Sequence, residues 1–292
     1  MFKKLFIATF ALIAFNVSAM KIHDGWEDIS SIVGQVSYES GVDAKLLAAV
    51  GAIESGFRPT VRAEGGTTSA TGLYQFTDRT WRVTLNSYGV LYGLDKDASR
   101  LDPYANTAMG AEYLKENQDI IEKRMNRRAT DVELYAAHLI SPLRVVILNR
   151  KPGSVLVADL YPSLAKHNKN LFYRGGRALT KVEFYRLLKH KLNVEYKRYG
   201  MLANNAVREH IDEVNKRTWL AATQNYNALD CHENALVRKY KESVVEEVER
   251  NIAYNMSSEY VLARGQSLIN DIPVSQGGLD DDVLYYDRRI FT

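Results

Sequence analysis

The sequence predicts a mainly α-helical fold with a small β element and a helical C-terminal extension. Apolar residues recur at the three- and four-residue spacing of an amphipathic helix in several segments, among them 26–36, 46–57 and 237–252. Thr130 and Glu133 have the spacing of a capping box, which starts another helix.

Length and composition limit the classes of protein that remain. The 292 residues are 46% hydrophobic and 25% charged, which fits one large or two modest globular domains. The net charge of +3 is far from the basic stripe of a nucleic-acid-binding protein, so no nucleic acid is expected as a partner. Cys231 is the only cysteine and the six histidines are scattered, so we expect no internal disulfide, no metal and no cofactor.

The N-terminal residues 1–19, MFKKLFIATFALIAFNVSA, have the pattern of a secretory signal peptide. Lys3 and Lys4 form the basic region, residues 5–15 are apolar, and Val-Ser-Ala precedes the expected cleavage point after Ala19. We therefore expect export, to the periplasm or out of the cell. The alternative is an uncleaved membrane anchor.

The first two helices are expected at residues 26–39 and 45–57. Asp43 is a suitable N-cap for the second helix, and Gly56 is a suitable stop signal near its end. Glu54 follows Val50 by four residues, so it lies on the apolar face of this helix.

Apolar surroundings make Glu54 a candidate general acid. A carboxyl group held against apolar surface has its charged form disfavoured, so we expect the pKa of Glu54 to be raised. A raised pKa is what a general acid needs in order to stay protonated near neutral pH. The alternative is a solvated glutamate in a fraying last turn.

The following segment alternates between loop and helix. The loop 58–69 contains two adjacent glycines and several Thr and Ser residues, which is typical of a segment that contacts substrate. Residues 70–76 are expected to be a short strand or extended piece lining a cleft. Thr77 is expected to cap a helix at 78–90, and further helices are expected at 107–118 and 130–140.

Two motifs in this region carry a family resemblance. The sequences IESGF at 53–57 and SATGLYQF at 69–76, followed by Thr-Trp at 80–81, resemble the SLT-type lytic transglycosylase domain of the lysozyme-like superfamily. That family cleaves the glycan strands of bacterial peptidoglycan, and Tyr74 stands where it usually has methionine. The resemblance implies a lysozyme-like catalytic lobe around a cleft.

A third motif is altered. The segment that ends in Ala137-His138 resembles the family's Ala-Tyr-Asn motif, with histidine in place of tyrosine, and phage-type versions of the family are more similar here and at 161–188. The Gly-Pro turn that usually follows is Ser141-Pro142 in this chain, which changes the expected turn geometry. The resemblance implies that His138 faces the glutamate or the sugar, and the alternative is a structural histidine.

The resemblance also implies roles for single residues. Glu54 would be the acid and then the base, and Ser55 would hydrogen-bond the N-acetyl group or the leaving oxygen unless its hydroxyl bonds its own helix. Gln75 and the backbone around Gly72 and Leu73 would line the central sugar subsite. Tyr74 would cover a sugar face; the alternative, a core aromatic residue, applies equally to Phe76 and is favoured for Trp81.

The C-terminal part matches no motif. We divide the chain into the signal peptide, a transglycosylase domain at 20–195 and a helical region of unknown role at 196–292. A helical hairpin packed on the domain is expected there, with an envelope or phage assembly partner as the other interpretation.

Two alternative functions stay open. A hydrolytic lysozyme would need a second carboxylate, for which Glu64, Asp78 and Asp95 are the nearest acids in the sequence. A wall-binding assembly protein without activity is the alternative from a different class. Peptidoglycan glycan strands are the expected partner in every case.

Overall fold

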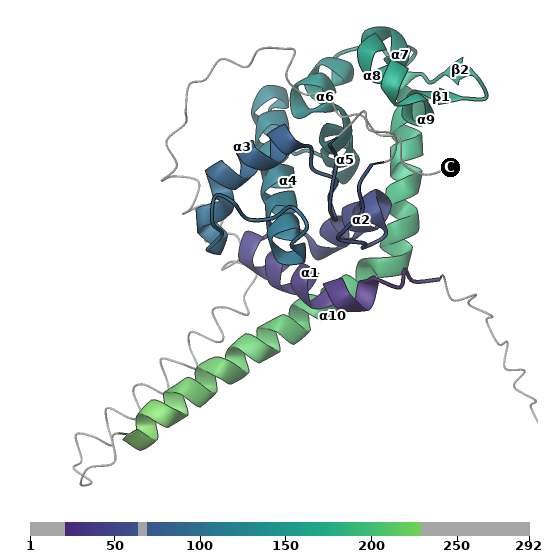
Figure 1. Ribbon diagram of the computed structural model, residues 1–292. Helices are drawn as coiled ribbons and strands as arrows, with labels where there is room; N and C mark the ends of the chain where they lie inside the picture. The colour runs from purple at the N-terminus through teal and green to yellow at the C-terminus, as the bar shows by residue number, and fades with distance from the viewer. Residues whose placement is uncertain (1–20, 64–68, 229–292) are drawn as a thin grey trace, which may run out of the picture.

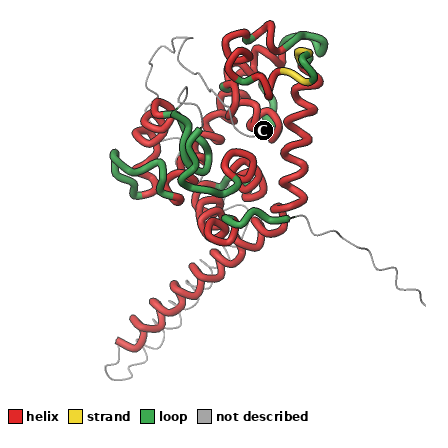
Figure 2. The backbone as a smooth tube through the Cα atoms, turned by 45° about the vertical axis from the view of Figure 1, so that its right-hand side comes forward, coloured by secondary structure: helices red, strands yellow, loops and turns green. Residues whose placement is uncertain are grey.

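The structure, a computed structural model, describes residues 21–63 and 69–228. The expected signal peptide, Glu64, Cys231 and the apolar stripe at 237–252 lie outside these ranges. Helices dominate the described part, as predicted (Figures 1 and 2). They are α1 (Trp26–Ser40), α2 (Ala44–Ser55), α3 (Asp78–Tyr88), α4 (Pro103–Met125), α5 (Asp131–Ile140), α6 (Pro142–Asn149), α7 (Val157–Leu160), α8 (Pro162–His167), α9 (Lys169–Phe172) and α10 (Lys181–Ala228).

The β structure is small. Within the described residues, one antiparallel hairpin pairs β1 (Tyr173–Arg174) with β2 (Arg177–Ala178). Residues 70–76, expected as a strand or extended piece, instead form a tight turn closed by a bridge between Thr71 and Phe76. Gly72 with φ 85° and Gln75 with φ 50° turn the backbone back on itself, which an extended strand does not allow.

Local sequence signals set the helix starts as predicted. The Asp43 side chain accepts a hydrogen bond from the Lys45 backbone N–H at 2.8 Å, Thr77 caps α3, and Thr130 and Glu133 form the capping box of α5. Asp102 caps α4.

Helix lengths differ from the expected ones at three places. Helix α2 ends at Ser55 rather than at Phe57, because Gly56 takes the left-handed conformation. The helix expected at 107–118 is the longer α4. It begins earlier, at Pro103 directly after its cap Asp102, because proline is favourable at the first position of a helix. After α3 the chain continues as the 3₁₀ helix η1 (Gly89–Tyr92).

Helix α10 connects the expected domain with the expected C-terminal region. The boundary placed at 195 falls inside this continuous helix, and Tyr199, Ala203 and Ala206 beyond it are still buried. Later side chains, up to residue 221, are exposed or partly exposed, and Figure 1 shows the end of α10 extending away from the other helices. No helix among the described residues has the length and apolar character needed to cross a membrane.

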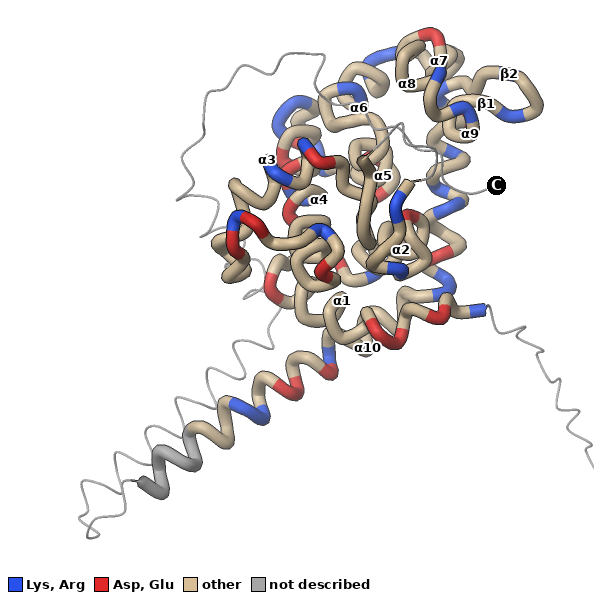
Figure 3. Tube along the Cα trace, viewed as in Figure 1, with Lys and Arg blue, Asp and Glu red and all other residues tan. Residues whose placement is uncertain are grey.

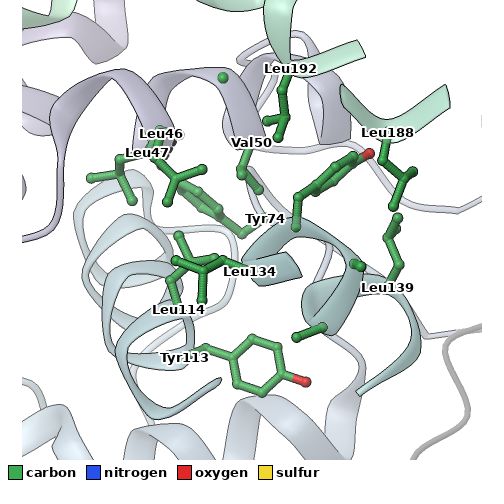
Figure 4. Packing of buried hydrophobic residues seen from close by; sticks show 14 of the residues in the cluster. Leu46, Leu47, Val50, Tyr74, Tyr113, Leu114, Leu134, Leu139, Leu188 and Leu192 are labelled. Atoms are coloured by element: carbon green, nitrogen blue, oxygen red, sulfur yellow. Dashed lines mark hydrogen bonds between the residues drawn. The ribbon is translucent and has the colours of Figure 1, made fainter. Parts of the chain in front are cut away.

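One hydrophobic core joins the helices. Figure 4 shows side chains of α2, α4, α5 and α10 meeting in it, including Val50 of α2 and Leu188 of α10. An aromatic group of Trp26, Phe57 and Tyr199 adds the start of α1 and the residues just after α2, with ring centroids 5.0 Å apart. This packing holds the end of α2 in place.

Candidate active site

Glu54 lies in the last turn of α2 and is almost completely buried. Its exposed fraction is 1%, which confirms the prediction that it lies on the apolar face rather than in a solvated, fraying turn. Gly56 ends the helix directly after Ser55, so the helix end places this carboxyl group at the start of a chain reversal. Burial of a carboxyl group away from water disfavours its ionised form.

His138 of α5 faces Glu54. Its Nε2 atom lies 3.8 Å from Oε1 of Glu54, and the imidazole is fully buried. Burial lowers the pKa of His138 to about 4, and an interaction with the Tyr74 backbone partly opposes this shift. At neutral pH the imidazole is therefore uncharged, and it supplies a dipole rather than a positive charge beside the carboxyl group.

The turn at 69–76 is fixed by side chains from other elements. The Asn106 side-chain oxygen accepts the Tyr74 backbone N–H at 2.8 Å, and its amide nitrogen donates to the Arg100 carbonyl at 2.7 Å. Arg100 in turn donates to the carbonyls of Ser69 and Phe76, both at 2.8 Å. The buried backbone of the turn is thus held by directional bonds.

Gly72 is required in this turn for two reasons. Its φ of 85° is unfavourable for residues with a side chain, and an added Cβ would lie 2.3 Å from the Asn106 amide nitrogen. The close neighbour of Gly72 in the structure is the protein's own Asn106, and its expected place in the sugar subsite stays a prediction. Leu73 beside it is fully buried.

The prediction that Tyr74 covers a sugar face is wrong for this structure. The ring is 1% exposed, and its hydroxyl donates to the carbonyl of Leu47 in α2 at 2.9 Å. Gly110 of α4 gives the ring its space, since a Cβ there would come within 2.6 Å of it. Tyr74 is a core residue, and so are Phe76 and Trp81.

Ser55 and Gln75 both direct side-chain groups to backbone carbonyls. The Ser55 hydroxyl donates to the Gly51 carbonyl at 3.0 Å, as in the structural alternative. The Gln75 amide nitrogen donates to the carbonyls of Gly72, at 2.7 Å, and Val61, at 3.2 Å. Its Oε1 atom is buried and accepts no hydrogen bond from the described residues.

Two buried polar residues of α4, one of them in contact with His138, were missed by sequence reasoning. The Tyr113 ring meets the His138 ring edge-on, with centroids 5.8 Å apart, and Asn117 lies one turn further along. Both side chains are buried, and the Tyr113 hydroxyl and both polar atoms of the Asn117 amide group lack a well-formed hydrogen bond to the described residues. Their four-residue spacing in the sequence was the available signal, because it places both on one helix face.

The turn after α5, where the altered motif lacks the family's glycine, has an unusual backbone conformation. Ser141 stands where the family usually has glycine, and it adopts φ 80° and ψ 151°, in a region that is nearly restricted to glycine. Pro142 then starts α6. The chain therefore leaves the His138 helix through a backbone conformation that glycine adopts more easily than serine.

The acids considered for a second carboxylate have other surroundings. Asp78 is paired with Arg100 and its side chain is 59% exposed, and Asp95 is exposed. Glu116 of α4, which the sequence analysis did not single out, is one turn from Tyr113. Burial, then Asp119 and Glu112, raises the pKa of Glu116. Among residues 21–63 and 69–228 there is no group of three or more His, Cys, Asp or Glu side chains arranged to hold a metal ion.

Comparison with known families identifies part of the chain. Residues 31–136 match the family model described as the transglycosylase SLT domain. The matched segment includes Glu54, the turn at 69–76, and α3 and α4, and it ends two residues before His138. The match agrees with the resemblance seen in the two sequence motifs.

Proposed function

We propose that this chain, whose residues 31–136 form a transglycosylase SLT domain, cleaves peptidoglycan with Glu54 as its acid and base. The family membership supports lytic transglycosylase-type activity on peptidoglycan in general. The finer proposal is cleavage of the β-1,4 bond between N-acetylmuramic acid and N-acetylglucosamine, with formation of a 1,6-anhydro-N-acetylmuramic acid end.

The reaction needs one carboxyl group and no water. The protonated Glu54 gives its proton to the glycosidic oxygen while the bond from that oxygen to the muramoyl C1 breaks. The carboxylate then removes the proton from the C6 hydroxyl of the same sugar, and that oxygen forms the new bond to C1. The carboxyl group ends protonated, as it began, and the acid step contributes roughly 10²–10⁴-fold to the rate.

The burial of Glu54 beside His138 is the observation that supports this role. Burial disfavours the ionised form of a carboxyl group, and the neutral imidazole of His138 adds no positive charge to oppose this effect. We propose that Glu54 carries a proton before the glycan binds, which is the starting state of the reaction. Transfer to the substrate also requires that the carboxyl group become accessible to the glycan.

The test is mass spectrometry of sacculi digested by the wild-type protein and by Glu54→Gln. Anhydro-ended fragments from the wild type alone are the expected result, with Asp95→Asn as a control for loss of an exposed acid. Anhydro products from Glu54→Gln at the wild-type rate would refute the assignment of Glu54.

Hydrolysis is the second candidate, because Glu116 of α4, next to Asn117 in the sequence, has a partly buried carboxyl group with a raised pKa. Fragments with free reducing ends would support it, and Glu116→Gln should then stop the reaction. The third outcome, binding of sacculi without any product, would support a wall-binding protein.

Location and further partners follow from the proposed substrate. We propose export by residues 1–19 and action in the periplasm or outside the cell, which N-terminal sequencing of the protein from the envelope fraction would test. The proposed role of the region 196–292 in contacting an assembly partner depends largely on residues outside the described ranges.

A further inference from the structure

A cavity with charged and apolar walls lies on the other side of helix α2 from Glu54. It has a volume of about 610 Å³ and is lined by residues of three segments: 23–25, 52–58 and 190–198. Ala52 is one of its lining residues, and two positions along an α-helix correspond to a rotation of roughly 200°. The cavity is therefore separated from the Glu54 carboxyl group by the body of the helix.

Basic groups outnumber acidic groups in this cavity. Its lining contains three cationic and two imidazole side chains against two carboxylates: Arg58, Lys191, Arg198, His23 and His190 against Asp24 and Glu195. Figure 3 shows basic positions along the part of α10 that passes α2.

One of the two carboxylates is already neutralised. Nη1 of Arg198 donates to both oxygens of Glu195, at 2.9 Å and 2.7 Å, and Glu195 is buried. The buried Nε–H of Arg198 has no acceptor among the described residues. Apart from this pair, the charged lining groups are Arg58, Lys191 and the exposed Asp24, so basic groups remain in excess along the lining.

The pKa of the His23 imidazole is affected by these charges. Burial, then the charges of Arg198 and Arg58, lowers the pKa of His23, and Asp24 opposes this shift. The pKa of Lys191 is also lowered, by partial burial and then by the charge of Arg174. An anion that enters beside His23 would oppose both the burial and the neighbouring cations, so it should raise the pKa of His23.

The remaining walls are apolar. Ala52, Ile53 and Val194 contribute hydrocarbon surface, and the volume exceeds what a single small ion needs. A guanidinium group and an ammonium group are the donors that proteins use for carboxylates and phosphates. The lining thus suits an anionic group carried on a larger molecule.

We propose that this cavity binds a carboxylate or phosphate group of the cell-wall polymer, away from the cleavage site. The choice of the wall polymer rests on the proposed function, whereas the anion site rests on the cavity and its charges. Wall peptides carry carboxylates and wall-linked polymers carry phosphodiesters, so both sources present the same chemistry. Binding here holds the enzyme on its polymer while Glu54 acts on the glycan.

The first experiment titrates inorganic phosphate, and separately acetate, into the full chain at constant ionic strength. Imidazole NMR signals of His23 and His190 are followed, with His167 on α8 as an internal reference. Saturable shifts and a raised pKa of His23 in the bound state are expected. Shifts that do not saturate, or that appear equally at His167, would overturn the proposal.

A matched pair of lysine variants locates the site. Lys191→Gln should weaken phosphate binding about fivefold to tenfold, since it removes one charge-assisted contact. Lys189→Gln removes the same charge from an exposed position on α10 that does not line the cavity, and it should leave the affinity unchanged. Equal weakening by both would mean that net charge alone is responsible, which contradicts a defined site.

The second experiment identifies the source and is independent of catalysis. Sacculi are incubated with Glu54→Gln and with Glu54→Gln combined with Lys191→Gln, before and after removal of phosphate polymers with hydrofluoric acid or amidation of carboxyl groups. A phosphate source loses the Lys191-dependent binding after acid treatment, and a carboxylate source loses it after amidation. Equal binding by the two variants on untreated sacculi would overturn the wall proposal, whether or not the wild type cleaves glycan.

Discussion

The two sides of helix α2 handle polar groups in opposite ways. On one side, Glu54 and His138 are enclosed and lie 3.8 Å apart, and burial keeps the imidazole uncharged. On the other side, Arg58, Lys191 and Arg198 line a cavity whose rim is exposed to water. Water solvates charges on the second side, whereas the first side holds groups whose neutral forms are favoured. One helix can therefore position an acid and border a basic site.

Substituting one residue on each side of α2 should separate glycan cleavage from phosphate binding, and this is the largest expected effect. Glu54→Gln should reduce glycan cleavage at least about 100-fold, because the proton donor is lost. It should leave phosphate affinity in the cavity unchanged. Lys191→Gln should weaken phosphate binding and leave the cleavage of short soluble glycan fragments unchanged. Loss of both properties in either variant would show that the two sides are not independent.

Acid should destabilise the enclosed side. The pKa of His138 is about 4 in the folded protein and about 6.5 in an unfolded chain, so the unfolded state binds more protons between these values. The free energy of unfolding should therefore fall by about 3 kcal/mol as the pH decreases from 6.5 to 4. It should be insensitive to this group above about pH 7.5.

Urea unfolding across this pH range measures the effect. His138→Gln should flatten the dependence, since glutamine does not titrate, while His167→Gln at a partly exposed position should keep the wild-type slope. Equal slopes for the wild type and His138→Gln would contradict the burial of a neutral imidazole.

The packing around the Tyr74 ring can be tested by adding a methyl group next to it. Gly110→Ala should reduce stability by about 2 kcal/mol, because the added methyl group would lie 2.6–2.9 Å from the Tyr74 ring atoms. Gly200→Ala on α10 is the control, since its methyl group would meet only the Lys45 side chain at 3.5 Å. That change should raise the midpoint of thermal unfolding through helix propensity. A neutral result for Gly110→Ala would mean that Tyr74 has room to move.

The smallest expected effect concerns the turn that follows His138. Ser141→Gly should stabilise the protein by about 1 kcal/mol, because relief of backbone strain exceeds the extra entropy of glycine in the unfolded chain. Ser141→Ala keeps the Cβ atom and should give no such gain. Chemical denaturation of the two variants compares them directly, and equal stabilities would argue against strain at this residue.

Local patterns were sufficient for the helix starts and for Glu54. Asp43, Thr77 and Thr130 each bond a backbone N–H two or three residues away, so the interaction is readable within a short window. The burial of Glu54 followed from its spacing to Val50 on one helix.

Contacts between distant segments could not be read in this way. Tyr74 was assigned to the sugar, but its hydroxyl bonds Leu47 and its ring packs on Gly110, each about 30 residues away in sequence. Tyr113 carries no recognisable motif, and only the packing of α4 against α5 brings it to His138. No helix pattern states which other helix it will contact.

The sequence by itself determined the helical class, the caps, the position of Glu54 in its helix and the two motifs that the SLT family match supports. Tertiary structure decided that His138 meets Glu54 rather than only a sugar, that Tyr74 belongs to the core, and that α10 borders a cavity behind α2. The physical reason is range. Caps and helix faces depend on neighbours a few residues apart, whereas burial and pKa depend on which elements pack together.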